Sequence, residues 1–152
     1  MQMMTVQVRG AEALKRKLAE LPRRVRSKVT RKAVTAGSTI VLQAARQNVP
    51  TRSKQLKKSL GRKGKTTKQG YYSKIGSRRG FNITLGSKIY NPSRISHLAE
   101  HGAKPHAIRS RRHPGAKPQP WLNPALERNL GQVKSTMASK MAYEIDQEAR
   151  QA

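Results

Sequence analysis

Two stretches in the first third of the chain carry apolar residues at helical spacing. Leucines recur four and three positions apart from Leu14 to Leu21, which predicts a short helix that Pro22 ends. From Val25 to Ala44, apolar residues recur every three or four positions and form one stripe along a longer helix. Pro50 stops that helix. Each helix therefore buries one face and needs another element to pack against.

Shorter stretches alternate between apolar and polar residues, which is the period of a β-strand. Thr5 to Val8 predicts a first strand near the start of the chain. Tyr71 to Gly76 and Phe81 to Tyr90 predict two more strands, and the segment from Ser77 to Gly80 between them is typical of a hairpin turn. We therefore expect these two strands to pair with each other.

Three further elements complete the expected fold. Ser53 to Leu60 predicts one or two helical turns, and Ile95 to His101 predicts a helical turn or a strand. Asn123 can cap a last helix with Pro124 at its first position, and a stripe from Leu126 to Ile145 extends it. The fold class expected is α+β. A single domain over residues 1–152 would pack a small antiparallel sheet against the long N-terminal-half helix and the C-terminal helix.

The charge of the chain narrows the classes of partner. Its 152 residues include 33 Lys and Arg but 7 Asp and Glu, a net charge of +26, and no acid occurs between Leu21 and Ala99. Such a charge opposes compaction and indicates a polyanionic partner or neutralisation by neighbouring subunits. We expect extended, mobile basic loops at about 61–70 and 103–119. The residues expected to contact nucleic acid or an acidic partner are Arg62, Lys63, Lys65, Lys68, Arg78, Arg79, Arg109, Arg111 and Arg112.

Several kinds of chemistry have no sequence signal here. Cys is absent, which excludes disulfides, thiol catalysis and thiolate zinc sites. The glycine-rich segments lack P-loop spacing, no G-x-S-x-G elbow occurs, and no pair of acids has the context of a catalytic pair. The longest apolar run, around Ile40, is far shorter than a membrane helix, and residues 1–10 do not resemble a signal peptide. We expect no catalytic residue, no cofactor and no membrane contact.

One short motif offers a metal-site alternative. His97, Glu100 and His101 spell H-x-x-E-H, and a helix would place the two histidines on one face, as zinc requires. A hydrolase would also need a third ligand and a cleft, and Gly102 interrupts the helix at once. Two ordinary histidines beside a structural glutamate are therefore the favoured interpretation, with no metal site.

Three segments, in this order, resemble one family. Residues 49–60, beginning Val-Pro-Thr, follow the long helix; residues 95–103 contain Ala-Glu-His-Gly; and residues 119–127, Gln-Pro-Trp-Leu-Asn-Pro-Ala-Leu-Glu, open the last helix. Together they look like the tail-completion, or head–tail joining, neck proteins of long-tailed bacteriophages. Arg52-Ser53 stands where the family usually has Gly, and residues 61–80 are unusually basic.

The resemblance implies a structural α+β virion subunit without catalytic activity. It would form a homo-oligomeric ring, often of six, that completes the tail and joins it to the head around the DNA channel. Its partners would be neighbouring neck, tail-terminator or head-completion proteins and genome DNA, and it would be made in the host cytoplasm. The residues expected to be structural or at subunit interfaces are Pro50, Leu56, Glu100, Gly102, Pro120, Trp121, Leu122 and Pro124.

Two of these residues carry a physical expectation of their own. Glu100 precedes a glycine in an acid-poor neighbourhood, so we expect it to pair with an arginine or a backbone N–H at a fold or subunit junction. Trp121, with Leu122, is expected to pin the last helix onto the sheet. The alternative function is a small basic RNA- or DNA-binding protein of ribosome-associated or nucleoid type. Whether the basic loops face DNA or an acidic neighbouring ring also stays open.

Overall fold

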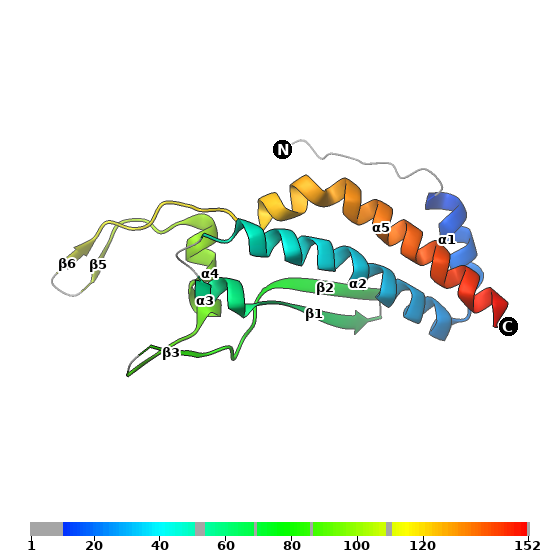
Figure 1. Cartoon of the computed structure of the whole chain (residues 1–152), viewed down its shortest axis with the longest axis horizontal. Helices are drawn as coiled ribbons and strands as arrows, with labels where there is room; N and C mark the ends of the chain where they lie inside the picture. The colour runs from blue at the N-terminus through cyan, green and yellow to red at the C-terminus, as the bar shows by residue number, and fades with distance from the viewer. Residues whose placement is uncertain (1–10, 51–53, 69, 86, 109–110, 152) are drawn as a thin grey trace. The chain divides into compact units, whose positions relative to one another are not determined.

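The computed structural model describes residues 11–50, 54–68, 70–85, 87–108 and 111–151, and its fold is α+β (Figure 1). The described residues form two compact units. Unit 1 comprises Met1–Ile40, Gly64–Ser73 and Leu130–Ala152, and unit 2 comprises Val41–Lys63 and Lys74–Asn129. The helices α2 and α5 contribute residues to both units, and each unit is described by itself. The predicted strand at Thr5 to Val8 lies outside the described residues.

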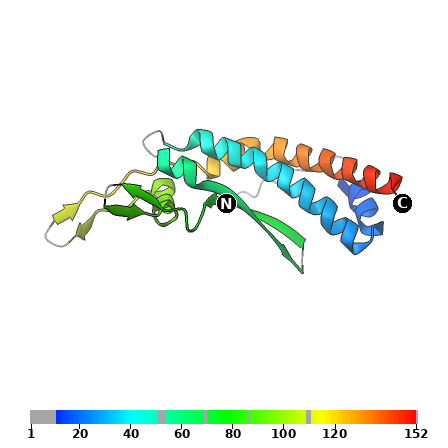
Figure 2. The same cartoon turned by 60° about the horizontal axis from the view of Figure 1, so that its bottom comes forward.

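Unit 1 is built on helices. It contains α1 (Ala11–Glu20), most of α2 (Arg23–Asn48) and most of α5 (Asn123–Arg150). There α5 lies alongside α2 in the opposite direction (Figures 1 and 2), since Lys28 bonds Glu148 and Lys32 bonds Glu144. Between the helices lie buried apolar residues, namely Val29, Ala33, Val133 and Ile145.

A glycine lets the two helices approach closely. A Cβ atom on Gly37 of α2 would lie 2.6 Å from Cγ of Met137 on α5, closer than ordinary packing allows. Part of each predicted apolar stripe is buried, with Val29 and Ala33 on α2 and Val133 and Ile145 on α5, whereas Leu126 of the last stripe is exposed. The proline ends are confirmed, because α1 ends before Pro22 and α2 ends before Pro50.

Unit 2 holds two short helices and most of the strands. The helices are α3 (Lys54–Ser59) and α4 (Pro92–His101), which confirms the helical turns predicted at Ser53 to Leu60 and resolves residues 95–101 as helix. The strands are β1 (Leu60–Thr67), β2 (Gly70–Ser77), β3 (Ile83–Leu85), β4 (Lys88–Tyr90), β5 (His106–Ile108) and β6 (Arg111–His113). Tips of β1 and β2 belong to unit 1.

The strand pairing corrects the predicted sheet. Strand β2 pairs with β1 and not with residues 81–90, which instead fold on themselves as the antiparallel pair β3 and β4, with Ile83 opposite Tyr90. A third antiparallel pair joins β5 to β6. The reason is that the backbone N–H of Arg78 donates to the carbonyl of Ser59, so the chain leaving β2 returns to the start of β1.

Both segments predicted as basic loops contain short strands. Residues 61–67 belong to β1, and the Thr67 hydroxyl donates to the Gly70 carbonyl at the turn into β2. Residues 103–119 carry the β5–β6 hairpin, above a stem in which Ala103 and Ala116 exchange two backbone hydrogen bonds of 2.9 Å. The expected mobility of these segments stays a prediction.

Candidate functional site

The carboxylate of Glu100, in the last turn of α4, accepts three backbone hydrogen bonds within unit 2. Its Oε2 accepts from the N–H groups of Trp121 (2.7 Å) and Leu122 (2.9 Å), and its Oε1 accepts from the N–H of Asn123 (3.0 Å). Only 8% of the Glu100 surface is exposed. A buried carboxylate with three donors at a helix N-terminus is a strong anchor, since the free N–H groups and the helix dipole both favour negative charge.

Local sequence explains how Glu100 reaches this position. The side chain of Asn91 accepts from the Ser93 N–H and caps α4, and Pro92 begins the helix. Gly102 ends it at a φ of 74°, with its N–H donating to the carbonyl of Leu98. A Cβ atom there would lie 2.6 Å from the Ala116 oxygen, so only glycine fits. The chain therefore turns away directly after Glu100.

The Glu100 contact modifies one prediction and resolves another. Helix α5 starts at Asn123, and the Leu126 N–H donates to the carbonyl of Leu122, so Asn123 lies one position inside the helix and does not cap it. The carboxylate of Glu100 takes the place of that cap. Of the two partners expected for Glu100, an arginine or a backbone N–H, the structure shows backbone N–H groups.

The environment of Glu100 keeps its carboxyl ionised. Burial alone raises the pKa of Glu100, but the backbone N–H groups of Asn123, Trp121 and Leu122 and the nearby His101 outweigh burial and lower the pKa below the usual 4.5. The carboxylate is therefore charged at neutral pH, as a helix anchor requires.

The same geometry bears on the zinc alternative. Both oxygens of Glu100 accept from backbone N–H groups at residues 121–123, while His97 and His101 are exposed on α4. Within the described ranges, no three His, Asp or Glu side chains gather closely enough to hold a metal ion. In the structure the H-x-x-E-H pattern thus places a hydrogen-bonded carboxylate beside two exposed histidines, and the absence of a metal site stays a prediction.

The predicted basic residues do not converge on one point. Lys65 and Lys68 belong to unit 1, whereas the other described members belong to unit 2. Arg78 is exposed but bound to its own unit: its guanidinium donates to the carbonyls of Ser59 and Lys58 and lies 5.0 Å above the ring of Phe81. The other exposed members of unit 2 are Arg62, Lys63, Arg79, Arg111 and Arg112. Arg109 lies outside the described residues.

The residues expected to be structural differ in burial. Leu56 is buried and Trp121 is 2% exposed, with the Asn48 amide donating to the Trp121 carbonyl. Pro50, Gly102, Leu122 and Pro124 are half-buried, and Pro120 is exposed. Contact of Trp121 with a sheet and the interface roles stay predictions.

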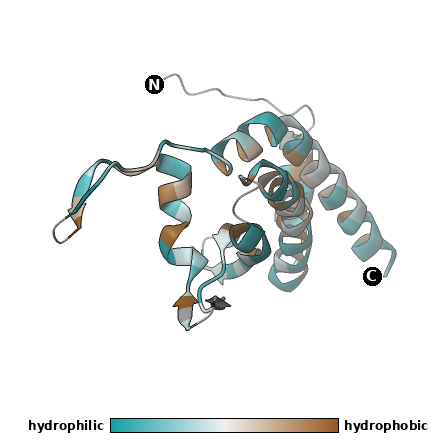
Figure 3. Cartoon of the chain, turned by 60° about the vertical axis from the view of Figure 1, so that its left-hand side comes forward, coloured by the Kyte–Doolittle hydropathy of each residue, from teal (hydrophilic) through white to brown (hydrophobic). Residues whose placement is uncertain are grey.

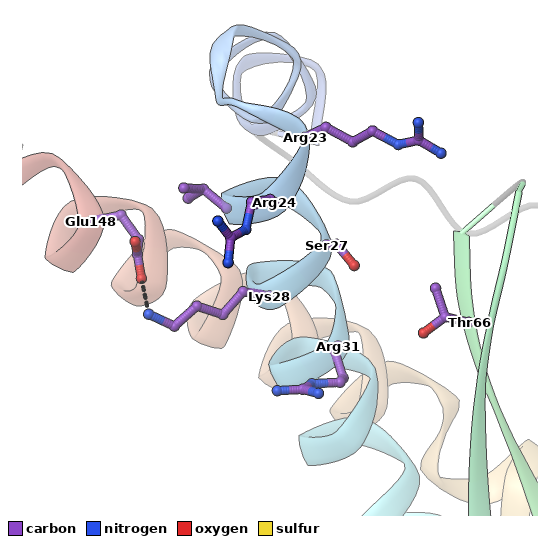
Figure 4. Close-up of a pocket in the computed structure, with 8 residues that line it drawn as sticks. Arg23, Arg24, Ser27, Lys28, Arg31, Thr66 and Glu148 are labelled. Carbon is purple, nitrogen blue, oxygen red and sulfur yellow. Dashed lines mark hydrogen bonds and ion pairs between the residues drawn. The ribbon is translucent and has the colours of Figure 1, made fainter.

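A cationic surface on α2 was missing from the predicted sites. Arg23, Arg24, Lys28 and Arg31 line a hollow of about 700 Å³ in unit 1, together with Ser27, Thr66 of β1 and Glu148 of α5 (Figure 4). The sequence held a signal for it, because α2 begins Arg-Arg-Val-Arg-Ser-Lys, a cluster of cations at the helix end where acids are favoured.

An apolar surface in unit 2 was missing too. Ile89, Tyr90 and Ile95 are exposed around a hollow of about 470 Å³ that Asn82, Asn91 and Arg94 also line. Figure 3 shows hydrophobic positions on α4 and the neighbouring β3–β4 hairpin. Strands of three residues are too short to show a clear alternation, so the sequence could not indicate which of these side chains face solvent.

Comparison with known proteins identifies the family of the chain. No curated protein and no solved structure matches it. Residues 12–102, more than half of the chain, match the family described as "Bacteriophage HK97-gp10, putative tail-component". The matched segment runs from α1 through α4 and includes Glu100, whereas the hydrogen-bond partners of Glu100 at residues 121–123 lie beyond it. Within the described residues, no helix is both long and apolar enough to cross a membrane. The chain belongs to the HK97-gp10-like family of bacteriophage tail components.

Proposed function

We propose that this tail component is a non-catalytic neck subunit of the virion. It forms a homo-oligomeric ring, often of six, which completes the tail and joins it to the head around the DNA channel. Its other partners are the neighbouring neck, tail-terminator or head-completion proteins. Family membership supports the structural role, and the order of the three resembling segments supports the position at the neck.

The exposed apolar surface of unit 2 carries the proposal. Ile89 is 71% exposed and Ile95 is 52% exposed, and both border the same hollow. Large apolar side chains that gather in one exposed place favour a protein contact that removes them from water. A ring supplies such a contact, since each subunit meets the next through two different surfaces and a closed rotation leaves none of them unpaired.

The basic strands supply the second contact. Lys63, Lys65, Arg111 and Arg112 are exposed on β1 and β6. We propose that these residues, with the other predicted cations, meet DNA in the channel or an acidic neighbouring ring. Either contact would offset the self-repulsion of a chain with a net charge of +26.

Measurements of the mass and shape of the assembled protein test whether it forms a ring. The nuclease-treated protein should be weighed by light scattering at high salt and imaged by negative stain, alone and after mixing with tails that lack it. We expect closed rings, free or at the head-proximal end of those tails, and restored joining of tails to heads. A protein that stays monomeric and does not sediment with such tails would contradict the proposal.

Two variants connect the ring to the apolar surface. Ile89→Lys with Ile95→Lys should abolish ring formation while leaving the far-ultraviolet circular dichroism unchanged. Tyr143→Lys is the matched control, because Tyr143 is 56% exposed on α5 and lies outside the apolar cluster. If both variants assemble as the wild type does, a different surface makes the ring.

A further inference from the structure

The hollow on α2 combines many cations with few counter-charges. Glu148 is its single acid and already bonds Lys28, at 2.6 Å between Nζ and Oε1. The other cations, Arg23, Arg24 and Arg31, are exposed and make no hydrogen bond or ion pair with any residue that the structure describes. Three guanidinium groups are therefore available to an external anion.

The spacing of these arginines suits a repeated charge. Arg23 and Arg31 are eight residues apart on one continuous helix, which is about 12 Å at 1.5 Å per residue. One strand of a nucleic acid duplex carries a phosphate about every 3.4 Å along its axis, so this distance spans about three to four phosphates. A small single anion would meet only one end of the surface.

The residues that line the hollow also favour nucleic acid over a protein as the partner. Besides the charged residues it contains the hydroxyl residues Ser27 and Thr66, on facing sides in Figure 4, and one half-buried apolar residue, Val25. Protein interfaces are built around an apolar centre with few charges. Interfaces with nucleic acid are more polar and strongly positive, with arginine and hydroxyl groups on the phosphates.

We infer that this face of α2 binds the sugar–phosphate backbone of nucleic acid, without reading its sequence. Arg23, Arg24 and Arg31 supply the charge-assisted contacts, and Ser27 and Thr66 lie where they can donate to phosphate oxygens. Every residue involved belongs to unit 1. The inference goes beyond the proposed ring, because a single subunit contains the whole surface.

Salt-dependent DNA binding tests this surface. The probe is a labelled duplex of about 30 base pairs and mixed sequence, titrated by fluorescence anisotropy between about 50 and 200 mM salt. The variant Arg23→Gln/Arg24→Gln/Arg31→Gln should bind at least about tenfold more weakly than the wild type at the lower salt. Its slope of log K against log salt should be shallower by about two to three, since each lost phosphate contact removes about 0.9.

The matched control is Arg16→Gln/Arg128→Gln/Arg150→Gln. It removes the same charge from three exposed arginines that line neither hollow and are not among the predicted contact residues, so it reports the effect of net charge alone. We expect its affinity to fall less than about threefold. Equal losses in the two variants would overturn the inference, and so would no binding by the wild type at the lower salt.

Two further measurements distinguish a loss of DNA binding from unfolding and from binding to an acidic protein. Thermal unfolding of the α2 variant should occur at or above the wild-type temperature, because arginines oppose the dipole in the first turn of a helix. Poly-glutamate is the competitor: if it binds more tightly than DNA and the α2 variant loses that binding, the surface takes an acidic protein and the inference is wrong. Ring formation is measured separately, so its failure would leave this inference standing.

Discussion

At the scale of single residues, Glu100 does the work that a capping side chain does in most helices. A local cap such as Asn or Ser satisfies one or two N–H groups of its own helix. Glu100 instead reaches across from α4, accepts from three consecutive N–H groups at the start of α5, those of Trp121, Leu122 and Asn123, and brings a full negative charge to the dipole. It therefore joins α4 to the start of α5 through a contact between residues 21 positions apart.

Replacing Glu100 by Gln should destabilise the protein by about 2–4 kcal/mol near neutral pH. The Gln amide keeps the shape, but its NH₂ group would face a backbone donor and leave buried N–H groups unsatisfied. Urea unfolding measures the cost. Glu127→Gln is the control, because Glu127 is exposed on α5; equal stabilities for the two variants would refute the anchor role.

The same pair of variants gives a pH dependence. Because the pKa of Glu100 is lower in the folded protein than the usual 4.5, its stabilisation is present above that pH. It is lost as the pH falls through the lowered folded value. The difference in unfolding free energy between wild type and Glu100→Gln should therefore be constant above about pH 5 and shrink in more acidic buffer. A difference that persists unchanged in acid would show that the charge is not responsible.

At the scale of elements, α2 and α5 are joined through Glu144 in unit 1. Only 4% of Glu144 is exposed, and its two oxygens bond Lys32 of α2 and Lys140 of its own helix. Lys32 and then Lys140 lower the pKa of Glu144 despite burial. A buried carboxylate with two cations thus holds the helices in register beside the apolar stripe.

Glu144→Gln should cost about 1–2 kcal/mol. Breaking a buried ion pair is expensive, but both lysines are about two-fifths exposed and regain water. A double-mutant cycle with Lys32→Gln should show coupling between the two sites, and Asp146→Asn, exposed on the same helix, should be near neutral. Additive effects would mean that the lysines do not contribute through this bond.

The helices were predictable from sequence, and the strands mostly were not. Proline at positions 22 and 50 and the apolar stripes define α1, α2 and α5 with little help from tertiary contacts. Strand β1 is exposed at most positions and runs through Gly61 and Gly64, so it has no alternating pattern to detect. Its pairing with β2 depends on the Ser59–Arg78 contact, which no local pattern encodes.

The sequence likewise identified one candidate site and missed another. Glu100 was identifiable because a lone acid before a glycine is unusual in a basic stretch, although its partners at 121–123 needed the structure. The sequence predicted contact residues in the basic loops and none on α2. In the structure, the hollow on α2 brings together Arg23, Arg31 and Thr66, which are separated by up to about 40 residues of sequence. A contact between distant segments cannot be read from composition.

At the scale of the whole molecule, the net charge of +26 opposes folding. Added salt shortens the screening length from about 10 Å at 0.1 M to about 3 Å at 1 M. We therefore expect the melting temperature to rise by several degrees over that range in potassium chloride, and further in sulfate. Differential scanning calorimetry checks this. A melting temperature that falls with salt would mean that the ion pairs at Glu144 and Glu148 outweigh the repulsion.

The stem at Ala103 and Ala116 allows the β5–β6 hairpin to change in length without moving the start of α5. The Ala103–Ala116 pair closes the base of the β5–β6 hairpin, and the Gln119 N–H donates to the Ala99 carbonyl one residue before the Glu100 anchor. Whatever lies beyond the stem is thus uncoupled from where α5 begins. The hairpin is therefore the segment that evolution can lengthen, shorten or recode to suit a different neighbour. It is also the place where an epitope tag can be inserted without disturbing the helices.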